Sequence, residues 1–141
     1  MLVNVSYNNK NITNKVDNAV GKPFTLKERW QMNGIGSPKL FIIGTSVEIM
    51  NLLILDNNTN SCNIELRPKG IIVRFRSLLE TFALVIPFYK LSILKGDLAT
   101  YTIYRDKYFI KVLADTKAVQ KFFQKIMAYK ADNMPPSIQD L

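Results

Sequence analysis

Histidine is absent from this chain of 141 residues, and cysteine occurs once, as Cys62. Acyl transfer, general acid–base catalysis at neutral pH and zinc or iron hydrolysis mostly depend on histidine. A single thiol can form neither a disulfide within the chain nor the multi-ligand set of a zinc site. We therefore expect a protein that is not an enzyme, has no cofactor or metal, and resides in a reducing compartment.

Long apolar runs are also missing. The longest candidate, residues 82–94, is interrupted by Pro87, Lys90 and Ser92, whereas a membrane-spanning helix needs about 18 or more apolar residues. Residues 1–7 show neither the basic segment nor the sustained apolar segment of a secretion signal. These patterns predict a cytoplasmic protein without a transmembrane segment.

Recognisable catalytic and phosphate-binding patterns are scarce as well. Gly34-Ile35-Gly36 is too short for a phosphate-binding glycine loop and precedes no helical pattern. The acidic residues occur singly, at turns or at a helix start, as in Asp56, Asp97, Asp106 and Asp115. An enzyme using a carboxylate pair remains an alternative, and it requires two of these groups to converge in one pocket.

The whole chain has a net charge of +8, and the positive charge is concentrated in its second half. Thirteen of the 19 Lys and Arg residues lie within residues 67–130, against four of the 11 acidic residues. Such an imbalance attracts anionic partners, either membrane headgroups or nucleic acid. The alternative is that the charge serves solubility alone.

The length of the chain and the positions of its Gly and Pro residues predict one domain with two flanking segments. Residues 1–46 contain short apolar stretches, residues 2–7, 30–32 and 40–43, separated by Gly and Pro, and we expect strands or an arm packed on the edge of a barrel. Residues 131–141, which contain Pro135-Pro136, are expected to form a flexible tail. A homodimer through the N-terminal strands is conceivable.

The sequence pattern of residues 47–130 predicts mostly strands. The apolar run 47–55 ends at a polar turn cluster, residues 56–60, which favours a strand, with a buried helix as the alternative. Residues 62–66 and 71–75 alternate apolar and polar side chains on either side of Pro68-Lys69-Gly70, which predicts a hairpin. Further strands are predicted at 82–86 and 91–94, and a second hairpin pairs 100–104 with 108–112.

One amphipathic helix, residues 115–130, follows the last hairpin, with Asp115 as its expected cap. Its apolar face is formed by Val119, Phe122, Phe123, Ile126 and Met127. Lys117, Lys121 and Lys125 fall on the opposite face, where we expect them to meet water. A strand-rich body followed by one such helix predicts a mainly β fold, a half-open barrel or sandwich of seven strands capped by the helix.

The first hairpin carries the candidate binding residues. We expect Arg67, Arg74 and Arg76 on its outer surface and Lys69 at its tip, a spacing suited to phosphate oxygens of headgroups or of a nucleic-acid backbone. A solvated sheet face is the alternative. Tyr101, Tyr104 and Tyr108 near the cations of the second hairpin make sequence-tolerant nucleic-acid binding a second functional hypothesis.

Residues 47–130 resemble a pleckstrin-homology-like (PH-like) domain, particularly its bacterial versions. The resemblance is carried by the order of hairpins, by Ile86-Pro87-Phe88 at a strand corner and by the capping helix, and Lys69, Arg74 and Arg76 are similar to that family's basic headgroup signature. It implies non-catalytic binding of phosphoinositides, peptides or other proteins. The partner is accordingly expected to be a protein or an anionic lipid or phosphate.

Overall fold

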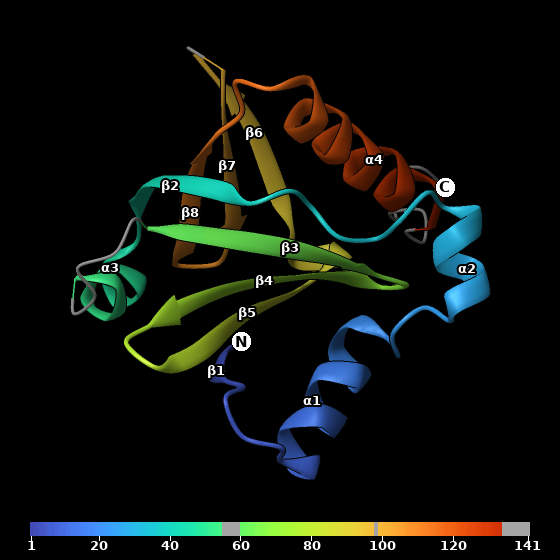
Figure 1. Cartoon of the computed structure of the whole chain (residues 1–141), viewed down its shortest axis with the longest axis horizontal. Helices are drawn as coiled ribbons and strands as arrows, with labels where there is room; N and C mark the ends of the chain where they lie inside the picture. Colours follow the sequence, from blue (N-terminus) through green and yellow to red (C-terminus); the bar gives the residue numbers. More distant parts are fainter. Residues whose placement is uncertain (55–59, 98, 134–141) are drawn as a thin grey trace.

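Within the residues that the structure describes, 1–54, 60–97 and 99–133, eight antiparallel strands form one open sheet with a helix across one side (Figure 1). In this computed structural model the strands are β1 (Leu2–Asn4), β2 (Leu40–Thr45), β3 (Ser61–Arg67), β4 (Gly70–Ser77), β5 (Glu80–Pro87), β6 (Ser92–Gly96), β7 (Thr100–Arg105) and β8 (Tyr108–Leu113). The helices are α1 (Lys10–Val20), α2 (Leu26–Gln31), α3 (Val47–Leu53), a 3₁₀ turn (Phe88–Lys90) and α4 (Lys117–Asn133). The prediction of a mainly β fold capped by a C-terminal helix is confirmed.

The strand order is β1-β5-β4-β3-β2-β8-β7-β6. β1 lies at an edge, where Leu2 pairs with Leu84 of β5. β2 lies in the interior of the sheet, because Leu40 pairs with Cys62 of β3 while Ile42 pairs with Val112 of β8. Residues 1–46 therefore supply both an edge strand and the strand that joins the β3–β5 group to the β6–β8 group.

The two predicted hairpins are confirmed. Ile64 of β3 pairs with Val73 of β4, and Ile103 of β7 pairs with Ile110 of β8. Gly70 opens β4 at a point where a Cβ atom would overlap the Ile86 carbonyl oxygen of β5 and would lie only 2.7 Å from Val20 Cγ1 of α1. The close approach of both β5 and α1 to the hairpin turn requires a glycine.

The predicted strand at residues 47–55 is wrong, because residues 47–53 form α3. Ile49 and Leu53, four residues apart, are buried, whereas Val47 and Met50 on the other side of the helix are apolar but exposed. Apolar residues on both sides conceal the helical period. Residues 55–59, most of the predicted turn cluster, lie outside the described residues.

Two N-terminal helices replace predicted strands or loops. Residues 30–32, predicted as a strand, are the end of α2 and its cap, and Thr25 and Glu28 form a capping box at the start of that helix. In the Asn-rich segment, the Asn9 side chain accepts hydrogen bonds from the first turn of α1. Both helices begin at side-chain caps, which is a local signal independent of the apolar pattern.

α4 begins and ends later than predicted. The Thr116 hydroxyl accepts a hydrogen bond from Val119 N at 3.3 Å, so the cap is Thr116 and not Asp115. The helix continues to Asn133, so residues 131–133 are helical and not part of a tail, and residues 134–141 lie outside the described residues.

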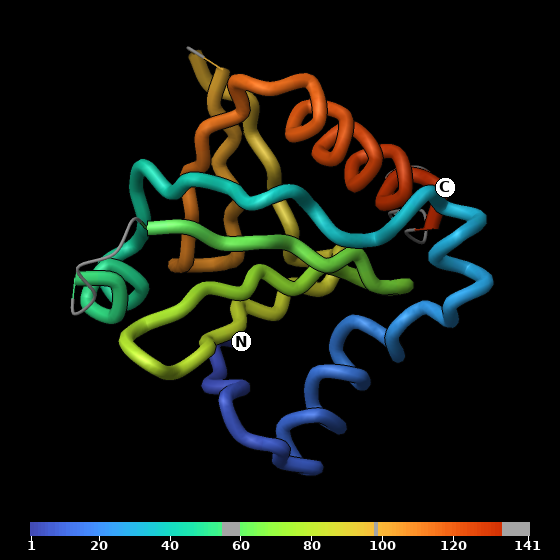
Figure 2. The backbone as a smooth tube through the Cα atoms, viewed as in Figure 1, coloured from blue at the N-terminus to red at the C-terminus, as the bar shows by residue number. Residues whose placement is uncertain are grey.

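Helices cover opposite faces of the β3–β5 group, as the tube in Figure 2 shows. α4 buries Val119, Phe122, Phe123 and Ile126 in the main core. α1 buries Val16 and Val20 on the outer face of the sheet, in a second core with Ile72, Ala83 and Val85. α4 thus covers one face of the sheet, as expected, and α1 covers the other.

Lys125 contacts protein rather than only water, contrary to expectation. Its Nζ donates hydrogen bonds to the carbonyl oxygens of Met32 at 3.0 Å and Gly34 at 3.2 Å. A cation at the carbonyl end of a helix is favourable, so Lys125 ties α4 to the end of α2. Across the described ranges, each helix is too short or too polar to cross a membrane.

Candidate functional site

The four basic candidates spread over the whole β3–β4 hairpin. Arg74 pairs with Asn63 across the hairpin, and the strand alternation puts Arg67, Arg74 and Arg76 on the outer face of the sheet. Lys69 lies in the turn, and Arg76 lies near the far end of β4, about 20 Å away at roughly 3.3 Å per residue. The structure therefore brings Arg67 and Arg74 together and leaves Lys69 and Arg76 at opposite ends.

Acidic partners occupy the two central arginines. The Arg67 guanidinium lies 3.1 Å from Asp17 Oδ1 and 2.5 Å from Glu65 Oε2, and its Nη1 also donates to the Gly21 carbonyl at 2.8 Å. Arg74 Nη1 lies 2.7 Å from Glu65 Oε1. We call Asp17, Arg67, Glu65 and Arg74 the ion-pair network. Arg67 does not face solvent as expected, because only 7% of its side chain is exposed.

Glu65 is the centre of the ion-pair network. Burial raises the pKa of Glu65, but the hydrogen bonds from Arg67 and Arg74 and their charges together outweigh it and leave the pKa below its usual value. Glu65 therefore stays ionised at neutral pH. Its charge and that of Asp17 cancel the two guanidinium charges, so this part of the hairpin lacks the excess positive charge that a phosphate site needs.

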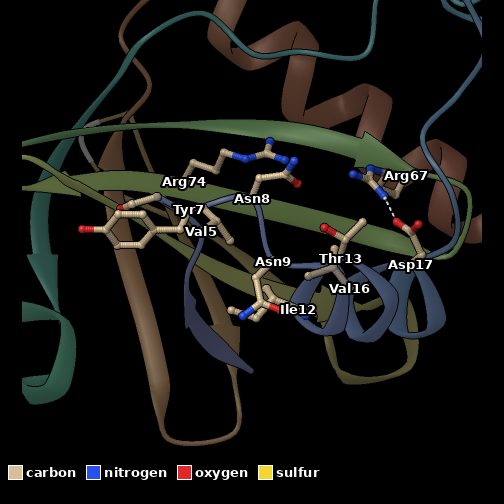
Figure 3. Close-up of a pocket in the computed structure, with 11 residues that line it drawn as sticks. Val5, Tyr7, Asn8, Asn9, Ile12, Thr13, Val16, Asp17, Arg67 and Arg74 are labelled. Atoms are coloured by element: carbon tan, nitrogen blue, oxygen red, sulfur yellow. Dashed lines mark hydrogen bonds and ion pairs between the residues drawn. The ribbon is translucent and has the colours of Figure 1, made fainter.

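A cavity of about 350 Å³ lies beside the ion-pair network (Figure 3). The β1–α1 connection and the first turns of α1 form one side, and Arg67 and Arg74 form the other. We call it the α1 pocket. Its lining mixes polar groups, such as Asn8 and Thr13, with apolar side chains, such as Ile12 and Val16.

Two other residues singled out by the sequence are buried. Cys62 lies in the core, where burial raises the pKa of its thiol to about 12, so it is neither accessible nor ionised at neutral pH. Tyr101 stacks on Phe123 of α4, with ring centroids 4.3 Å apart. Its ring is part of the core and is unavailable for stacking on a nucleic-acid base.

α3 and the β4–β5 turn lie at the same end of the sheet (Figure 1), and both carry exposed apolar side chains. Val47 and Met50 of α3 and Ile54 directly after it fall on one side of the helix, and Val47 and Ile54 are more than 70% exposed. The β4–β5 turn lies at the same end, because Ser77 Oγ donates a hydrogen bond to the Leu52 carbonyl of α3.

That turn consists of two leucines. Ser77 pairs with Glu80, so Leu78 and Leu79 alone form the loop, with exposed fractions of 56% and 88%. Leu78 has a φ of 57°, a conformation in which two-residue hairpin turns favour Asn, Asp or Gly. We call Val47, Met50, Ile54, Leu78 and Leu79 the α3 surface.

Polar and charged groups border the α3 surface. Lys107 Nζ lies 3.4 Å from Glu48 Oε1. Glu80 accepts a hydrogen bond from Asn4 Nδ2 at 2.8 Å, and Arg76 is exposed. The border therefore contains both signs of charge, with the acidic groups already paired to neighbouring side chains.

The sequence contained signals for this surface that our interpretation did not use. Two adjacent leucines at positions 78 and 79, between two predicted strands, depart from the polar composition of turns. The helical alternative for residues 47–55 places Val47, Met50 and Ile54 on one face, which the strand interpretation conceals. The pairing of Arg67 with Asp17 had no local signal, because 50 positions separate the two residues.

Comparison with family models, curated proteins and solved structures returned no match to this chain. Among the described residues, no three Cys, Asp or Glu side chains gather closely enough to hold a metal ion.

Proposed function

We propose that this chain is a non-catalytic, cytoplasmic binding module of PH-like shape that docks a partner protein through the α3 surface. The PH-like assignment is supported by two groups of strands that pair antiparallel in chain order, β2–β5 and β6–β8, by the pairing of β2 with β8 that joins them, and by α4 across the open side of the sheet. A non-catalytic role is supported by the absence of histidine and by the burial of Cys62.

The observation that carries the docking proposal is the Leu78–Leu79 turn. A leucine at positive φ costs about 1 kcal/mol or more of backbone strain, and two leucines exposed to water gain nothing from burial. A sequence selected for stability alone would have Asn or Gly there. Residues that break a local rule without a structural gain are expected at functional sites.

The border of the α3 surface favours a protein over an anionic membrane or a nucleic acid as the partner. An apolar centre within a polar border of both charge signs is the usual anatomy of a protein interface. A membrane surface or a nucleic acid would be attracted by a cluster of unpaired cations, whereas this border has one exposed arginine, Arg76, and a lysine, Lys107, that is paired with Glu48. Arg67 and Arg74 are likewise paired and lie on the hairpin face that α1 covers.

The test places a photo-crosslinking amino acid at position 79, and in a second protein at position 94, in the native cells. Leu94 lies on β6 and is 59% exposed, so it controls for exposed apolar contact in general. We expect a discrete crosslinked protein from position 79 that is absent from position 94. The purified pair should then associate, and Leu79→Ser should weaken the association at least tenfold while Leu94→Ser leaves it unchanged.

Other occupants of the α3 surface give distinguishable results. If anionic vesicles bind the purified chain and Leu79→Ser abolishes that binding, the partner is a membrane and the proposal is wrong. If the chain is a dimer by light scattering and Leu79→Ser makes it a monomer, the surface joins two copies and the proposal is equally wrong. Equal weakening by the two serine variants would remove the special role of the turn.

A further inference from the structure

The α1 pocket lies away from the α3 surface and has chemistry of its own. Its polar side is made by the guanidinium groups of Arg67 and Arg74, which project from β3 and β4 toward α1 (Figure 3). In the same view the Asn8 side chain lies beside Arg74, and Thr13 points from α1 toward the strands. A cavity of about 350 Å³ is at the lower end of the size range of small-ligand sites.

Hydrogen bonding in the ion-pair network leaves N–H donors of Arg74 beside the pocket, whereas Asp17, the carboxylate that lines the pocket, accepts a hydrogen bond from Arg67 through Oδ1. Both carboxylate oxygens of Glu65 are engaged, Oε1 by Arg74 and Oε2 by Arg67. Within the described part of the chain, Arg74 donates only through Nη1, and a third of its side chain is exposed. The fork formed by its other N–H groups therefore has the geometry to bind a carboxylate in a bidentate manner.

The charge balance favours a ligand with one negative charge over a ligand with two. Asp17 and Glu65 already neutralise the two guanidinium groups, and their carboxylates repel a dianion such as phosphate more strongly than a monoanion. A monoanion gains the charge-assisted hydrogen bonds of Arg74 at a smaller desolvation cost. The apolar side chains of Val5, Ile12 and Val16 on the remaining wall suit a short hydrocarbon part.

We propose that the α1 pocket binds a carboxylate carried on a small apolar group, with Arg74 holding the carboxylate and with Asn8 and Thr13 as secondary polar contacts. The carboxylate can come from a free organic acid or from the C-terminus of a peptide, and the chemistry recognised is the same. This site is independent of the α3 surface, and neither proposal depends on the other.

The test titrates the ¹⁵N-labelled full chain with sodium butyrate and, separately, with butyramide, which has nearly the same shape and no charge. We expect saturable shifts of the Thr13 amide and the Arg74 Nε signal with butyrate at millimolar concentration. Butyramide should bind at least tenfold more weakly, because it lacks the charge-assisted pair. Inorganic phosphate should also be weaker than butyrate.

Two variants test whether Arg74 binds the carboxylate. Arg74→Gln leaves Glu65 paired with Arg67 and should weaken butyrate binding about tenfold or more, whereas Arg76→Gln, two residues along the same strand and outside the pocket, should leave it unchanged. Thr13→Val, which replaces the hydroxyl with a methyl group of similar size, should weaken binding by a few-fold, and it provides an independent test if Arg74→Gln does not fold.

The same titrations show whether the carboxylate comes from a peptide or from a free acid, and which results overturn the proposal. Acetyl-Leu-Ala with a free C-terminus binding more tightly than butyrate identifies a peptide carboxylate, and the reverse order identifies a free acid. The proposal is overturned if butyramide or phosphate binds as well as butyrate. It is also overturned if Arg74→Gln and Arg76→Gln have equal effects, or if Thr13 and Arg74 show no shifts.

Discussion

The guanidinium of Arg67 lies 3.1 Å from the carboxylate of Asp17, although 50 positions separate these residues in the sequence. This contact fastens α1 to the end of β3, next to the second core that Val16 and Val20 form with the sheet. An N-terminal segment rich in asparagine and lysine is therefore an integral part of the fold, held by both an ion pair and apolar burial.

Replacing Asp17 with Asn should destabilise the protein by about 1–2 kcal/mol, because a largely buried guanidinium loses one of its charged partners but keeps Glu65 and the Gly21 carbonyl. Urea-induced unfolding measures the change in the free energy of unfolding. Asp97→Asn, at an exposed position, is the control and should change it by less than about 0.5 kcal/mol. Equal effects would show that the contact with Arg67 contributes nothing.

Replacing Leu78 with Asn should raise the free energy of unfolding by about 0.5–1 kcal/mol, because asparagine tolerates the positive φ of this turn. The same variant should bind the partner protein more weakly. Thermal unfolding and a binding assay on one preparation measure both effects. A loss of stability together with full binding would contradict both the strain and the docking role of this leucine.

Acid should weaken the fold partly through Glu65. The pKa of Glu65 is lowered in the folded state from 4.5, so its contribution is present above that value and is lost as pH falls through the lower folded pKa. Glu65→Gln should therefore be less stable than the natural chain at pH 7 but lose less stability on acidification below about pH 4.5. Urea unfolding at a series of pH values tests this, and parallel curves for the two proteins would contradict it.

Replacing Gly70 with Ala should cost about 2 kcal/mol or more, because the added Cβ would lie 2.7 Å from Val20 Cγ1 and 2.8 Å from Pro87 Cα. Gly36→Ala is a matched control, since no heavy atom within 4 Å would meet its Cβ. Urea unfolding compares the two variants. Similar stabilities would mean that β5 and α1 do not approach the hairpin turn as closely as described.

Local patterns identified the elements whose two faces differ. The β3–β4 hairpin alternates apolar and polar side chains, the β7–β8 hairpin is rich in residues that favour strands, and α4 has a clear apolar face, so all three could be predicted from the sequence. α3 was misassigned because its exposed side is also apolar, the very property that makes it a candidate docking surface. The short helix α2 differs from the predicted strand at residues 30–32 because the local helix signal is the capping box of Thr25 and Glu28 and not the apolar pattern of Trp30 and Met32.

The candidate sites were harder to predict than the fold. The sequence placed Arg67 and Arg74 on one hairpin face, but the acidic groups that occupy them come from α1 and from the neighbouring strand position Glu65. Glu65 lies on the same hairpin as both arginines, whereas Asp17 is 50 positions from Arg67, so only the contact with Asp17 depends on residues distant in sequence. The Leu78–Leu79 turn, by contrast, could have been recognised from composition alone.

The position of β2 has a consequence for how the chain folds. The hairpins on either side of it can form from neighbouring residues, but the two halves of the sheet join only when Ile42 reaches Val112, at the opposite end of the sequence. Closing so long a loop is slow, because its entropic cost precedes the contacts that offset it. The rate of folding should therefore respond more strongly to changes in the β2–β8 pairing than to changes in either hairpin turn.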